Sequence, residues 1–239
     1  MQETNCYALI LAGGIGQRMG NMEKPKQFIE LKGKPILIHT IEKFYLNPKF
    51  QQILVLTPKQ WMNHTGNLLK KYLPDGGEKL VVLEGGATRN DTLMNGISYI
   101  EKKGAMDEET IVVTHDAVRP FVTTRIIEEN IQAAKETGAC DTVIPATDTI
   151  VTSTDGQSIS EIPNRSFMYQ GQTPQSFKAQ MLKDLYQSLN EAEKQVLTDA
   201  AKICVIKGKN VKLVDGEVYN IKITYPYDVD VAKSLLKEE

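Results

Sequence analysis

The stretch that decides the fold is YALILAGGIGQRMG, which occupies residues 7–20. It begins with five apolar or aromatic residues, an uninterrupted run that is typical of a strand buried on both faces of a sheet. The run passes directly into glycines, which let the backbone approach a ligand closely and present N–H groups to anionic oxygens. A buried strand that ends in such a loop predicts an anion-binding site at one edge of a parallel sheet.

Outside this stretch, short apolar runs alternate with amphipathic stretches. The apolar runs predict strands at 7–11, 53–56, 80–83, 111–113 and 142–144, with a further strand near 211–214. Helical periodicity predicts helices at 35–46, 61–72, 88–102, 125–135, 178–190 and 198–205, and from residue 226 onward. This order predicts an α/β protein with a three-layer Rossmann-like fold, in which helices cover both faces of a mostly parallel sheet. Because no repeat or linker divides the chain, we expect one domain over residues 1–239.

Local signals support several of these helices. Thr88 is a potential N-cap, and Asp91 three residues later completes a capping-box pattern. Gly138 is a potential C-cap for the helix at 125–135. Pro226 suits the first position of the last helix.

The region 147–173 departs from this alternation. Two short segments, 149–152 and 158–162, flank Asp155-Gly156, which is a strong hairpin signal. We therefore expect a projecting β-hairpin arm, for which the pattern allows the role of a lid or of a dimer contact.

Composition excludes several classes of protein. With 41% apolar and 24% charged residues in 239, the chain resembles an ordinary globular protein rather than a disordered one. A net charge of −2 disfavours a protein that coats nucleic acid. No apolar run approaches the ~18 residues that cross a membrane, and the first residues lack a signal-peptide pattern, so we expect a cytoplasmic protein. The three cysteines have no metal-ligand spacing.

The glycine loop differs from two known phosphate-binding loops. It lacks the Gly-Lys-Ser/Thr ending of a Walker A loop. Gly14 and Gly16 match a dinucleotide-binding loop, but Met19 occupies the third glycine position. The strand at 53–56 is also not followed by an acid that could hold a ribose, which makes a nicotinamide-dependent oxidoreductase the weaker interpretation.

Two cations distinguish this loop. Arg18 lies within it and Lys26 follows shortly after. Fixed cations suit a nucleoside triphosphate, which carries more negative charge than a pyrophosphate diester. The alternative is that both are ordinary solvated side chains.

Two further motifs follow predicted strands. HDAVRP (residues 115–120) ends the fourth strand, where Asp116 can hold Mg²⁺ between phosphates. GGATRNDT (residues 85–92) joins the third strand to a helix, whose free N–H groups can bind a phosphate or a pyrimidine edge. In the alternative interpretation, the first motif is a turn with a surface arginine and the second is a set of helix caps.

Taken together, these motifs resemble a known family. LAGGIGQRM (residues 11–19) and PKQF (residues 25–28) resemble the signature of sugar-phosphate and polyol-phosphate nucleotidyltransferases. HDAVRP and GGATRNDT are similar to segments of the methylerythritol-phosphate and ribitol-phosphate cytidylyltransferases. The resemblance covers essentially the whole chain. It implies a nucleotidyltransferase fold, Mg²⁺ as cofactor, and transfer of CMP from CTP to a polyol phosphate with release of pyrophosphate.

The resemblance also implies roles for the matching residues. The cations that assist catalysis would be Arg18, Lys26 and Lys222. The nucleotide would be bound by Leu11, Ala12, Gly13, Gly14, Gly16, Gly86, Arg89, Thr92, Asp116 and Ala117. The polyol phosphate would be bound by Arg119, Arg165, Thr173, Thr198 and Lys222, and the metal by Asp116. Ala87 departs from the family, which often has an acid at this place.

In the family the arm crosses to a second subunit. The resemblance therefore implies a homodimer in which Arg165 acts in the partner's site. From the sequence alone, Arg165 is equally a solvated turn residue and Thr198 a helix N-cap.

The resemblance also favours one acceptor. KPKQF (residues 24–28), THDAVRPF (residues 114–121) and MYQGQTPQSF (residues 168–177) look more like the ribitol-5-phosphate branch, with Val118 where the methylerythritol branch usually has alanine. This implies that D-ribitol 5-phosphate is converted to CDP-ribitol for teichoic-acid synthesis. Methylerythritol 4-phosphate, an isoprenoid precursor, is the alternative acceptor. An oxidoreductase and a catalytically silent nucleotide-binding protein remain open as other classes.

Overall fold

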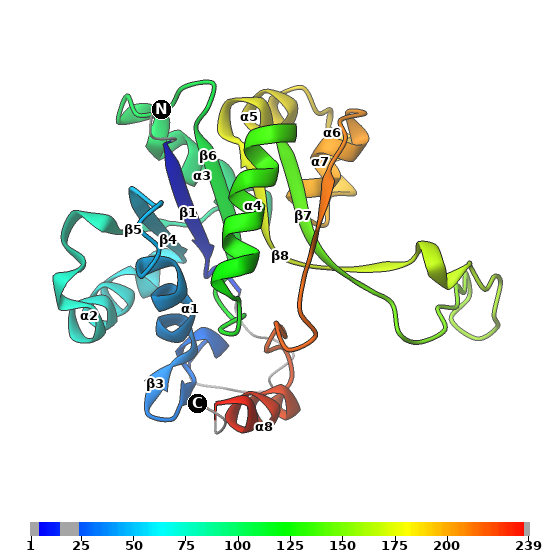
Figure 1. The fold of residues 1–239 in the computed structure, drawn as a ribbon, viewed down its shortest axis with the longest axis horizontal. Helices are drawn as coiled ribbons and strands as arrows, with labels where there is room; N and C mark the ends of the chain where they lie inside the picture. Colours follow the sequence, from blue (N-terminus) through cyan, green and yellow to red (C-terminus); the bar gives the residue numbers. More distant parts are fainter. Residues whose placement is uncertain (1–4, 15–23, 237–239) are drawn as a thin grey trace.

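The central feature of the structure, a computed structural model that describes residues 5–14 and 24–236, is a seven-stranded sheet. Its strands are β1 (Cys6–Leu11), β4 (Gln52–Thr57), β5 (Leu80–Glu84), β6 (Ile111–Asp116), β7 (Ala139–Pro145), β8 (Tyr169–Lys178) and β9 (Lys212–Asp215). They lie in the order β5-β4-β1-β6-β8-β7-β9 (Figure 1). The first four are parallel to one another, β8 is antiparallel to both its neighbours, and β9 is parallel to β7. The expected mostly parallel α/β fold is confirmed.

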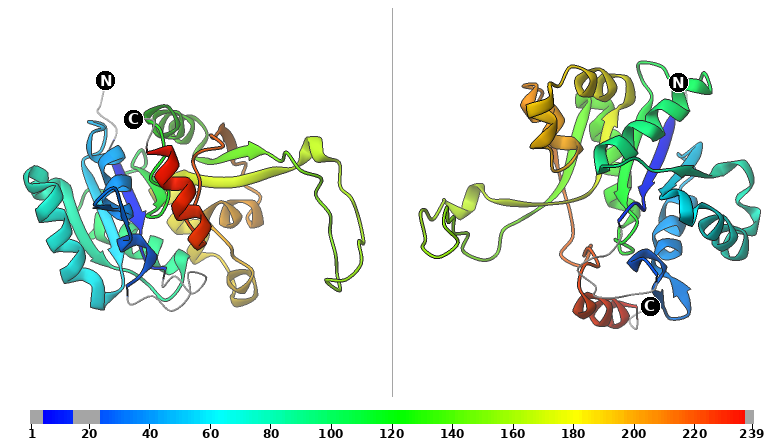
Figure 2. Two further views of the ribbon diagram at one scale, coloured as in Figure 1. Left: turned by 90° about the horizontal axis from the view of Figure 1, so that it is seen from below. Right: turned by 180° about the vertical axis from the view of Figure 1, so that it is seen from behind.

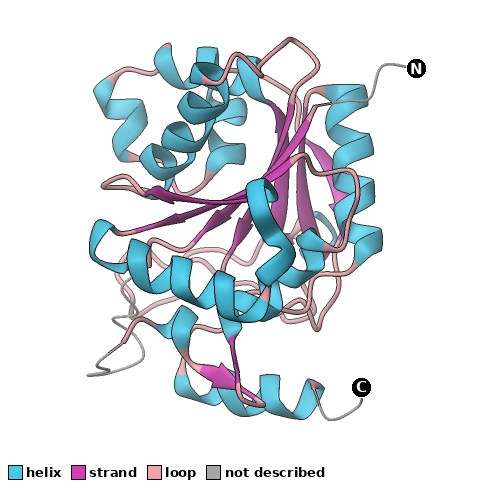
Figure 3. Ribbon diagram, turned by 90° about the vertical axis from the view of Figure 1, so that its left-hand side faces the viewer, coloured by secondary structure: helices cyan, strands magenta, loops and turns pink. Residues whose placement is uncertain are grey.

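Helices cover both faces of this sheet (Figure 3). They are α1 (Ile36–Tyr45), α2 (Met62–Tyr72), α3 (Arg89–Lys102), α4 (Thr124–Thr137), α5 (Ala179–Gln187), α6 (Glu191–Gln195), α7 (Ala200–Ile206) and α8 (Pro226–Leu235). In the described ranges, no helix combines the length and apolar character needed to cross a membrane.

The alternation of side chains along β1 explains the two apolar cores. Ala8 and Ile10 pack in the core that α1 and α4 cover, whereas Tyr7 and Leu9 pack in the core that α3, α5 and α7 cover. All four side chains are almost completely buried. Since successive side chains of a strand point to opposite faces, a central strand between two helical layers must be apolar throughout.

Several helix boundaries agree with their local signals. Thr88 and Asp91 form the expected capping box of α3, and Gly138 ends α4 in a left-handed conformation with φ of 86°. Pro226 begins α8 as predicted. The helix expected at 198–205 starts two residues later, because the Asp199 side chain accepts from the Lys202 N–H and caps it. Thr198 is therefore not the N-cap.

The sequence did not predict strand β8. It lies between β6 and β7, and its residues 169–173 fall within the region expected to be arm. Its sequence YQGQTPQSFK contains three glutamines, a glycine and a proline and has no apolar alternation. Pairing with two neighbouring strands supplies the order that intrinsic strand propensity does not. The helix expected at 178–190 is shorter than predicted. It ends at Gln187, and α6 follows as a separate short helix.

The segment between β7 and β8, residues 146–168, projects away from the sheet and is called the arm below (Figures 1 and 2). The Asp155 carboxylate accepts from the N–H groups of Gln157 and Ser158 and forms the expected turn. The two flanking segments, however, are joined by a single bridge between Thr152 and Glu161. The prediction of two hairpin strands is thus wrong for most of the arm, although its projection is as expected.

A small unit lies below the sheet in Figure 1, where α8 packs beside the short hairpin β2 (Glu30–Leu31) and β3 (Lys34–Pro35). Its apolar core contains Leu31, Ile36, Val118, Ile223 and Ala232. Through this core, the C-terminal part of the chain is held against the loop that follows β6.

Candidate functional site

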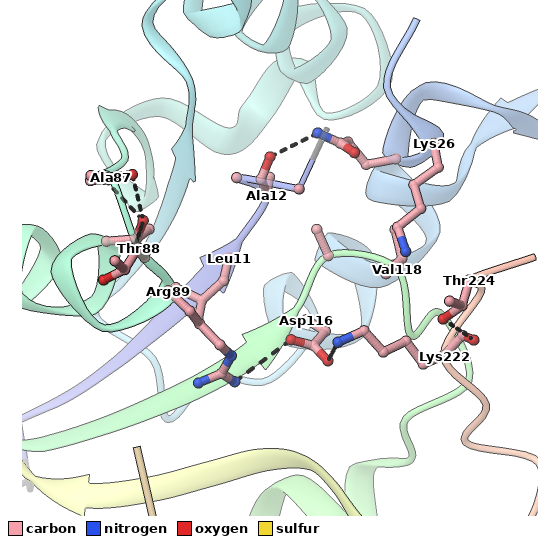
Figure 4. Close-up of a pocket in the computed structure, with 16 residues that line it drawn as sticks. Leu11, Ala12, Lys26, Ala87, Thr88, Arg89, Asp116, Val118, Lys222 and Thr224 are labelled. Carbon is pink, nitrogen blue, oxygen red and sulfur yellow. Dashed lines mark hydrogen bonds and ion pairs between the residues drawn. The ribbon is translucent and has the colours of Figure 1, made fainter. Parts of the chain in front are cut away.

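A pocket of about 490 Å³ opens at the carboxyl ends of β1 and β6 (Figure 4). In the order β5-β4-β1-β6, these two parallel strands are neighbours, and open α/β proteins bind ligands in the crevice outside the carboxyl ends of such strands. The lining residues are Leu11, Ala12, Gly13, Gly14, Lys26, Gln27, Gly86, Ala87, Thr88, Arg89, Thr92, Asp116, Ala117, Val118, Lys222 and Thr224. Three of these residues are cationic and one is a carboxylate, so the described lining favours an anionic ligand.

Asp116 is the electrostatic centre of the pocket. Lys222 Nζ lies 2.9 Å from its Oδ2, and Arg89 Nη2 lies 3.6 Å from its Oδ1. These two cations approach the carboxylate from opposite sides (Figure 4). Arg119 adds a third contact, with Nε 3.4 Å from Oδ2.

The three cations decide the charge of Asp116. Burial on its own raises the pKa of a carboxyl group, and Asp116 is only 7% exposed. The charges of Arg89, Lys222 and Arg119 outweigh burial and hold the pKa of Asp116 well below its usual range. The group is therefore a carboxylate throughout the physiological range of pH.

A second layer of hydrogen bonds holds Asp116 in place. Its backbone N–H donates to Thr173 Oγ1, 3.1 Å away. The same hydroxyl lies 3.0 Å from His115 Nδ1, and His115 Nε2 lies 3.0 Å from the Arg119 carbonyl. Arg119 Nη1 in turn donates to the Asn220 carbonyl at 2.7 Å. Sequence reasoning did not identify Asn220, whose burial is visible only in the folded chain.

Lys26 is positioned by the C-terminal part of the chain. Its side chain is 8% exposed, and Nζ donates to the Ile223 carbonyl at 2.9 Å. The Ile223 N–H donates to the carbonyl of Val118, which ties this segment to the loop after β6. The neighbouring Gln27 donates from Nε2 to the Ala12 carbonyl at 2.7 Å and so secures the start of the glycine loop.

The loop after β5 is shaped by a glycine and a threonine. The Gly86 N–H donates to Thr92 Oγ1 at 2.9 Å, and the same hydroxyl donates to the Thr88 carbonyl at 2.8 Å. A Cβ at Gly86 would lie 2.4 Å from that of Asp91, so only glycine fits there. This close packing places the start of α3, with Arg89, at the edge of the pocket.

The structure brings most of the predicted site residues together. The predicted residues that line the pocket are Leu11, Ala12, Gly13, Gly14, Lys26, Gly86, Arg89, Thr92, Asp116, Ala117 and Lys222. Gly16 and Arg18 lie outside the described residues. Gln27, Val118 and Thr224 also line the pocket but were not predicted, although Gln27 adjoins Lys26 in the PKQF motif.

Four predicted acceptor residues lie elsewhere. Arg119 and Thr173 are buried behind Asp116, where their described contacts hold the carboxylate. Thr198 is exposed and precedes the cap of α7. Arg165 lies on the arm, where Nη1 donates to the Thr147 carbonyl at 2.9 Å.

The carboxylate content of the pocket limits the kind of metal site it can form. Among the described residues, no group of three histidine, cysteine, aspartate or glutamate side chains is placed to hold a metal ion. Mg²⁺, however, is commonly held by one or two carboxylates together with the phosphates of a substrate. Asp116, an ionised carboxylate that faces the pocket, fits this second arrangement.

Comparisons with known proteins agree with this geometry. Residues 6–238 match the family model of 2-C-methyl-D-erythritol 4-phosphate cytidylyltransferase. The chain is similar to the solved 4-diphosphocytidyl-2C-methyl-D-erythritol synthase of Anaerococcus prevotii, with 27% identity, a TM-score of 0.81, and coverage of 98% of this chain and 97% of that one. It is also similar to the 2-C-methyl-D-erythritol 4-phosphate cytidylyltransferase of Francisella tularensis, with 28% identity, a TM-score of 0.79, and coverage of 97% and 99%.

We predict that His115 makes stability depend on pH. Burial lowers the pKa of His115 to about 4, whereas an unfolded histidine has a pKa of about 6.5. Between these values the unfolded chain binds more protons, so the free energy of unfolding falls as pH is lowered from 6.5 towards 4, by up to roughly 3 kcal/mol from this group.

Urea unfolding of the wild type and of His115→Gln at pH 7.5 and pH 5 measures this effect. The variant keeps every other titrating group and is expected to be less stable at pH 7.5, with a gap that shrinks by about 2 kcal/mol at pH 5. A gap that is the same at both pH values would contradict the prediction.

Proposed function

The chain belongs to the 2-C-methyl-D-erythritol 4-phosphate cytidylyltransferase family, and from this premise we propose that D-ribitol 5-phosphate is the acceptor of its CMP transfer. The protein is a cytidylyltransferase, which transfers CMP from CTP to a sugar phosphate. The observation that carries the assignment to this pocket is Asp116 at the end of β6, which holds Arg89 and Lys222 in a pocket that Gly13 and Gly14 also line.

In the proposed reaction, an oxygen of the acceptor phosphate attacks the α-phosphorus of CTP. A new P–O bond forms, the bond from the α-phosphorus to the bridging oxygen breaks, and pyrophosphate leaves with the electron pair of that bond. The acceptor phosphate is already ionised at neutral pH, so the step needs no strong general base. The barrier lies largely in bringing two anions together in line, which cationic side chains relieve.

The cationic side chains that offset the phosphate charge come from different segments of the chain. We assign Lys26, which enters from the loop after the glycines, and Lys222, which enters from the C-terminal segment, to the charge that develops on the phosphates. Arg18 is assigned to the same role from the sequence resemblance. Gly13 and Gly14 line the pocket beside them, where a Cβ at Gly14 would meet no atom of the described residues within 4 Å, so the triphosphate has close access to the backbone.

Asp116 is the proposed ligand of Mg²⁺. When bound with the triphosphate, the metal would neutralise phosphate charge and align the reacting groups. Asp116 also has a role that needs no metal, because its carboxylate orients the side chains of Arg89 and Lys222.

Two observations bear on the acceptor. The segments KPKQF, THDAVRPF and MYQGQTPQSF support D-ribitol 5-phosphate, with CDP-ribitol as the product and teichoic-acid synthesis as the pathway. The names of the family model and of the similar structures favour 2-C-methyl-D-erythritol 4-phosphate as a second candidate. Those structures are 27% and 28% identical to this chain, which leaves room for a different acceptor. With CTP as donor, either reaction belongs in the cytoplasm.

We also propose a homodimer that forms through the arm. Several large apolar side chains of the arm and of the start of β8 are exposed: Val151, Ile159, Ile162, Phe167 and Tyr169. A projecting segment with this many exposed apolar groups is typical of a protein–protein contact. In such a dimer, Arg165 would reach the pocket of the partner.

We expect the purified protein to release pyrophosphate from CTP and Mg²⁺ with D-ribitol 5-phosphate. A parallel reaction with 2-C-methyl-D-erythritol 4-phosphate distinguishes the two acceptors. Release with the methylerythritol compound alone would keep the transfer reaction and overturn the proposed acceptor. If neither acceptor supports pyrophosphate release, the protein binds nucleotides without this activity.

We predict that Lys26→Ala and Asp116→Ala each lower the rate of pyrophosphate release at least about tenfold. The first change removes a buried cation from the phosphates, and the second leaves Arg89, Arg119 and Lys222 without their carboxylate. Lys24→Ala is the matched control, because Lys24 is an exposed lysine two residues from Lys26 and should retain the wild-type rate. A near-normal rate in either pocket variant would contradict the assignment, provided that the melting temperature is unchanged.

A complementation assay tests Arg165 across the dimer. We expect Arg165→Ala and Lys26→Ala to be weak as separate proteins and to regain about a quarter of wild-type activity when their subunits are mixed and exchanged. The mixed dimer holds one pocket with both residues intact, whereas a residue that acts in its own subunit allows no such recovery. A monomer in light scattering would contradict the proposed dimer directly.

A further inference from the structure

Three polar side chains form a row across the sheet beside the pocket. Thr114 of β6 pairs in register with Gln175 of β8, and Gln175 pairs with Asp141 of β7. Directly opposed residues on neighbouring strands point to the same face of a sheet. Leu9, which pairs with Thr114 on the other side, packs in the core that α3 covers, so the row faces α3 and α7. We call these three residues the polar row.

The polar row has unused hydrogen-bonding capacity. Thr114 is completely buried and Gln175 is 1% exposed. Among the described residues, no hydrogen-bond partner exists for Thr114 Oγ1, Gln175 Oε1, Asp141 Oδ1 or Arg89 Nη1. Buried polar atoms are almost always hydrogen-bonded, so four such atoms in one place point to a partner that is not part of the described chain.

This place adjoins the reaction site. Arg89 connects the two electrostatically, because its Nη2 pairs with Asp116 and its charge also lowers the pKa of Asp141 against the effect of burial. On the far side, Gln175 Nε2 donates to Asp199 Oδ2 at 3.1 Å, at the start of α7. The row therefore extends from the pocket towards α7, on the side away from β1 and the glycine loop.

Of the three side chains, only that of Asp141 is partly exposed, at the end of the row beside a glycine. A Cβ at the exposed Gly171 would lie 3.7 Å from Asp141 Oδ2. Because Gly171 has no side chain, nothing at position 171 covers Asp141 Oδ2, whereas Oδ1 is buried.

The hydrogen-bonding chemistry of these four unpartnered atoms indicates a class of ligand. Arg89 offers a donor, Thr114 offers a hydroxyl that donates or accepts, and Gln175 and Asp141 offer acceptors. Burial, reinforced by Asp199 and partly offset by a hydrogen bond from Gln175, raises the pKa of Asp141 to about 7. A phosphate would face the acceptor oxygens of Asp141 and Gln175, which disfavour an anion that only accepts. Hydroxyl groups, which donate and accept at once, match the set.

We propose that the polar row binds the hydroxyl groups of the acceptor, so that Thr114, Asp141 and Gln175 select a polyol chain while the cations beside Asp116 bind its phosphate. This inference rests on the proposed function and adds to it the residues that recognise the acceptor's carbon chain. In the free protein, water is expected to satisfy the same atoms, and the polyol displaces it.

Steady-state kinetics of Asp141→Asn and Gly171→Val tests the proposal on the full-length protein. The first change keeps the size of the side chain but alters its hydrogen bonding, and the second covers Asp141 without entering the core. For each we expect the KM of the polyol phosphate to rise at least about fivefold, with the KM of CTP within about twofold of the wild type. Asp215→Asn, an exposed aspartate on neighbouring β9, is the matched control and should change neither constant.

A shorter substrate distinguishes a binding role of Asp141 from a purely structural one. D-erythritol 4-phosphate has one hydroxyl fewer than D-ribitol 5-phosphate. If Asp141 binds the hydroxyl end of the chain, Asp141→Asn should lower kcat/KM less for the shorter substrate than for the longer one.

The outcomes separate the two proposals. A wild type that uses only 2-C-methyl-D-erythritol 4-phosphate overturns the ribitol acceptor, and the same variants are then assayed with that polyol. An active wild type whose acceptor KM is unchanged in both variants overturns the polar row as a binding site and leaves it as a site for water. A wild type that is inactive with every polyol phosphate overturns both proposals.

Discussion

Burial of one carboxylate, that of Asp116, is the constraint around which the pocket is organised. A buried carboxylate is costly unless cations and hydrogen bonds compensate it. Here the compensation comes from Arg119, three residues further along the chain, and from two distant segments that carry Arg89 at the start of α3 and Lys222 before α8. Each of these elements must be in place for the ion pairs to form. The same charge that stabilises the assembled site therefore also aims two cations into the pocket.

The second constraint is the order of the strands. Neighbouring β1 and β6 are parallel and end at the same edge, so the glycines and Asp116 are brought to one crevice. The small unit made by β2, β3 and α8 closes this crevice from below, because Ile223 pairs with Val118 and accepts from Lys26. The cations come from flexible side chains, but their attachment points are rigid. Such preorganisation suits a reaction in which the protein supplies charge and alignment rather than covalent chemistry.

Strong local signals predicted much of the fold. The apolar run of β1, the capping box of α3 and the left-handed glycine after α4 each act within a few residues, and the structure agrees with them. Prediction failed where order comes from distant partners. The polar sequence of β8 is ordered by β6 and β7 on its two sides, and the segments of the arm share only one bridge. The nicotinamide interpretation, which the missing ribose acid already disfavoured, gives way to the nucleotidyltransferase family.

What the sequence by itself determined is the chemistry of the reacting centre. The glycines, Lys26, Arg89, Asp116 and Lys222 stand in short motifs whose residue types already indicate phosphate binding. Only the tertiary structure decided which polar groups meet. It places Thr173 and Arg119 behind Asp116, and it aligns Thr114, Gln175 and Asp141 across three strands. The physical reason is that a motif encodes contacts between neighbours in the chain, whereas strand register and burial depend on elements far apart in it, as the hydrogen bond between Asp116 and Thr173 shows with its separation of 57 residues.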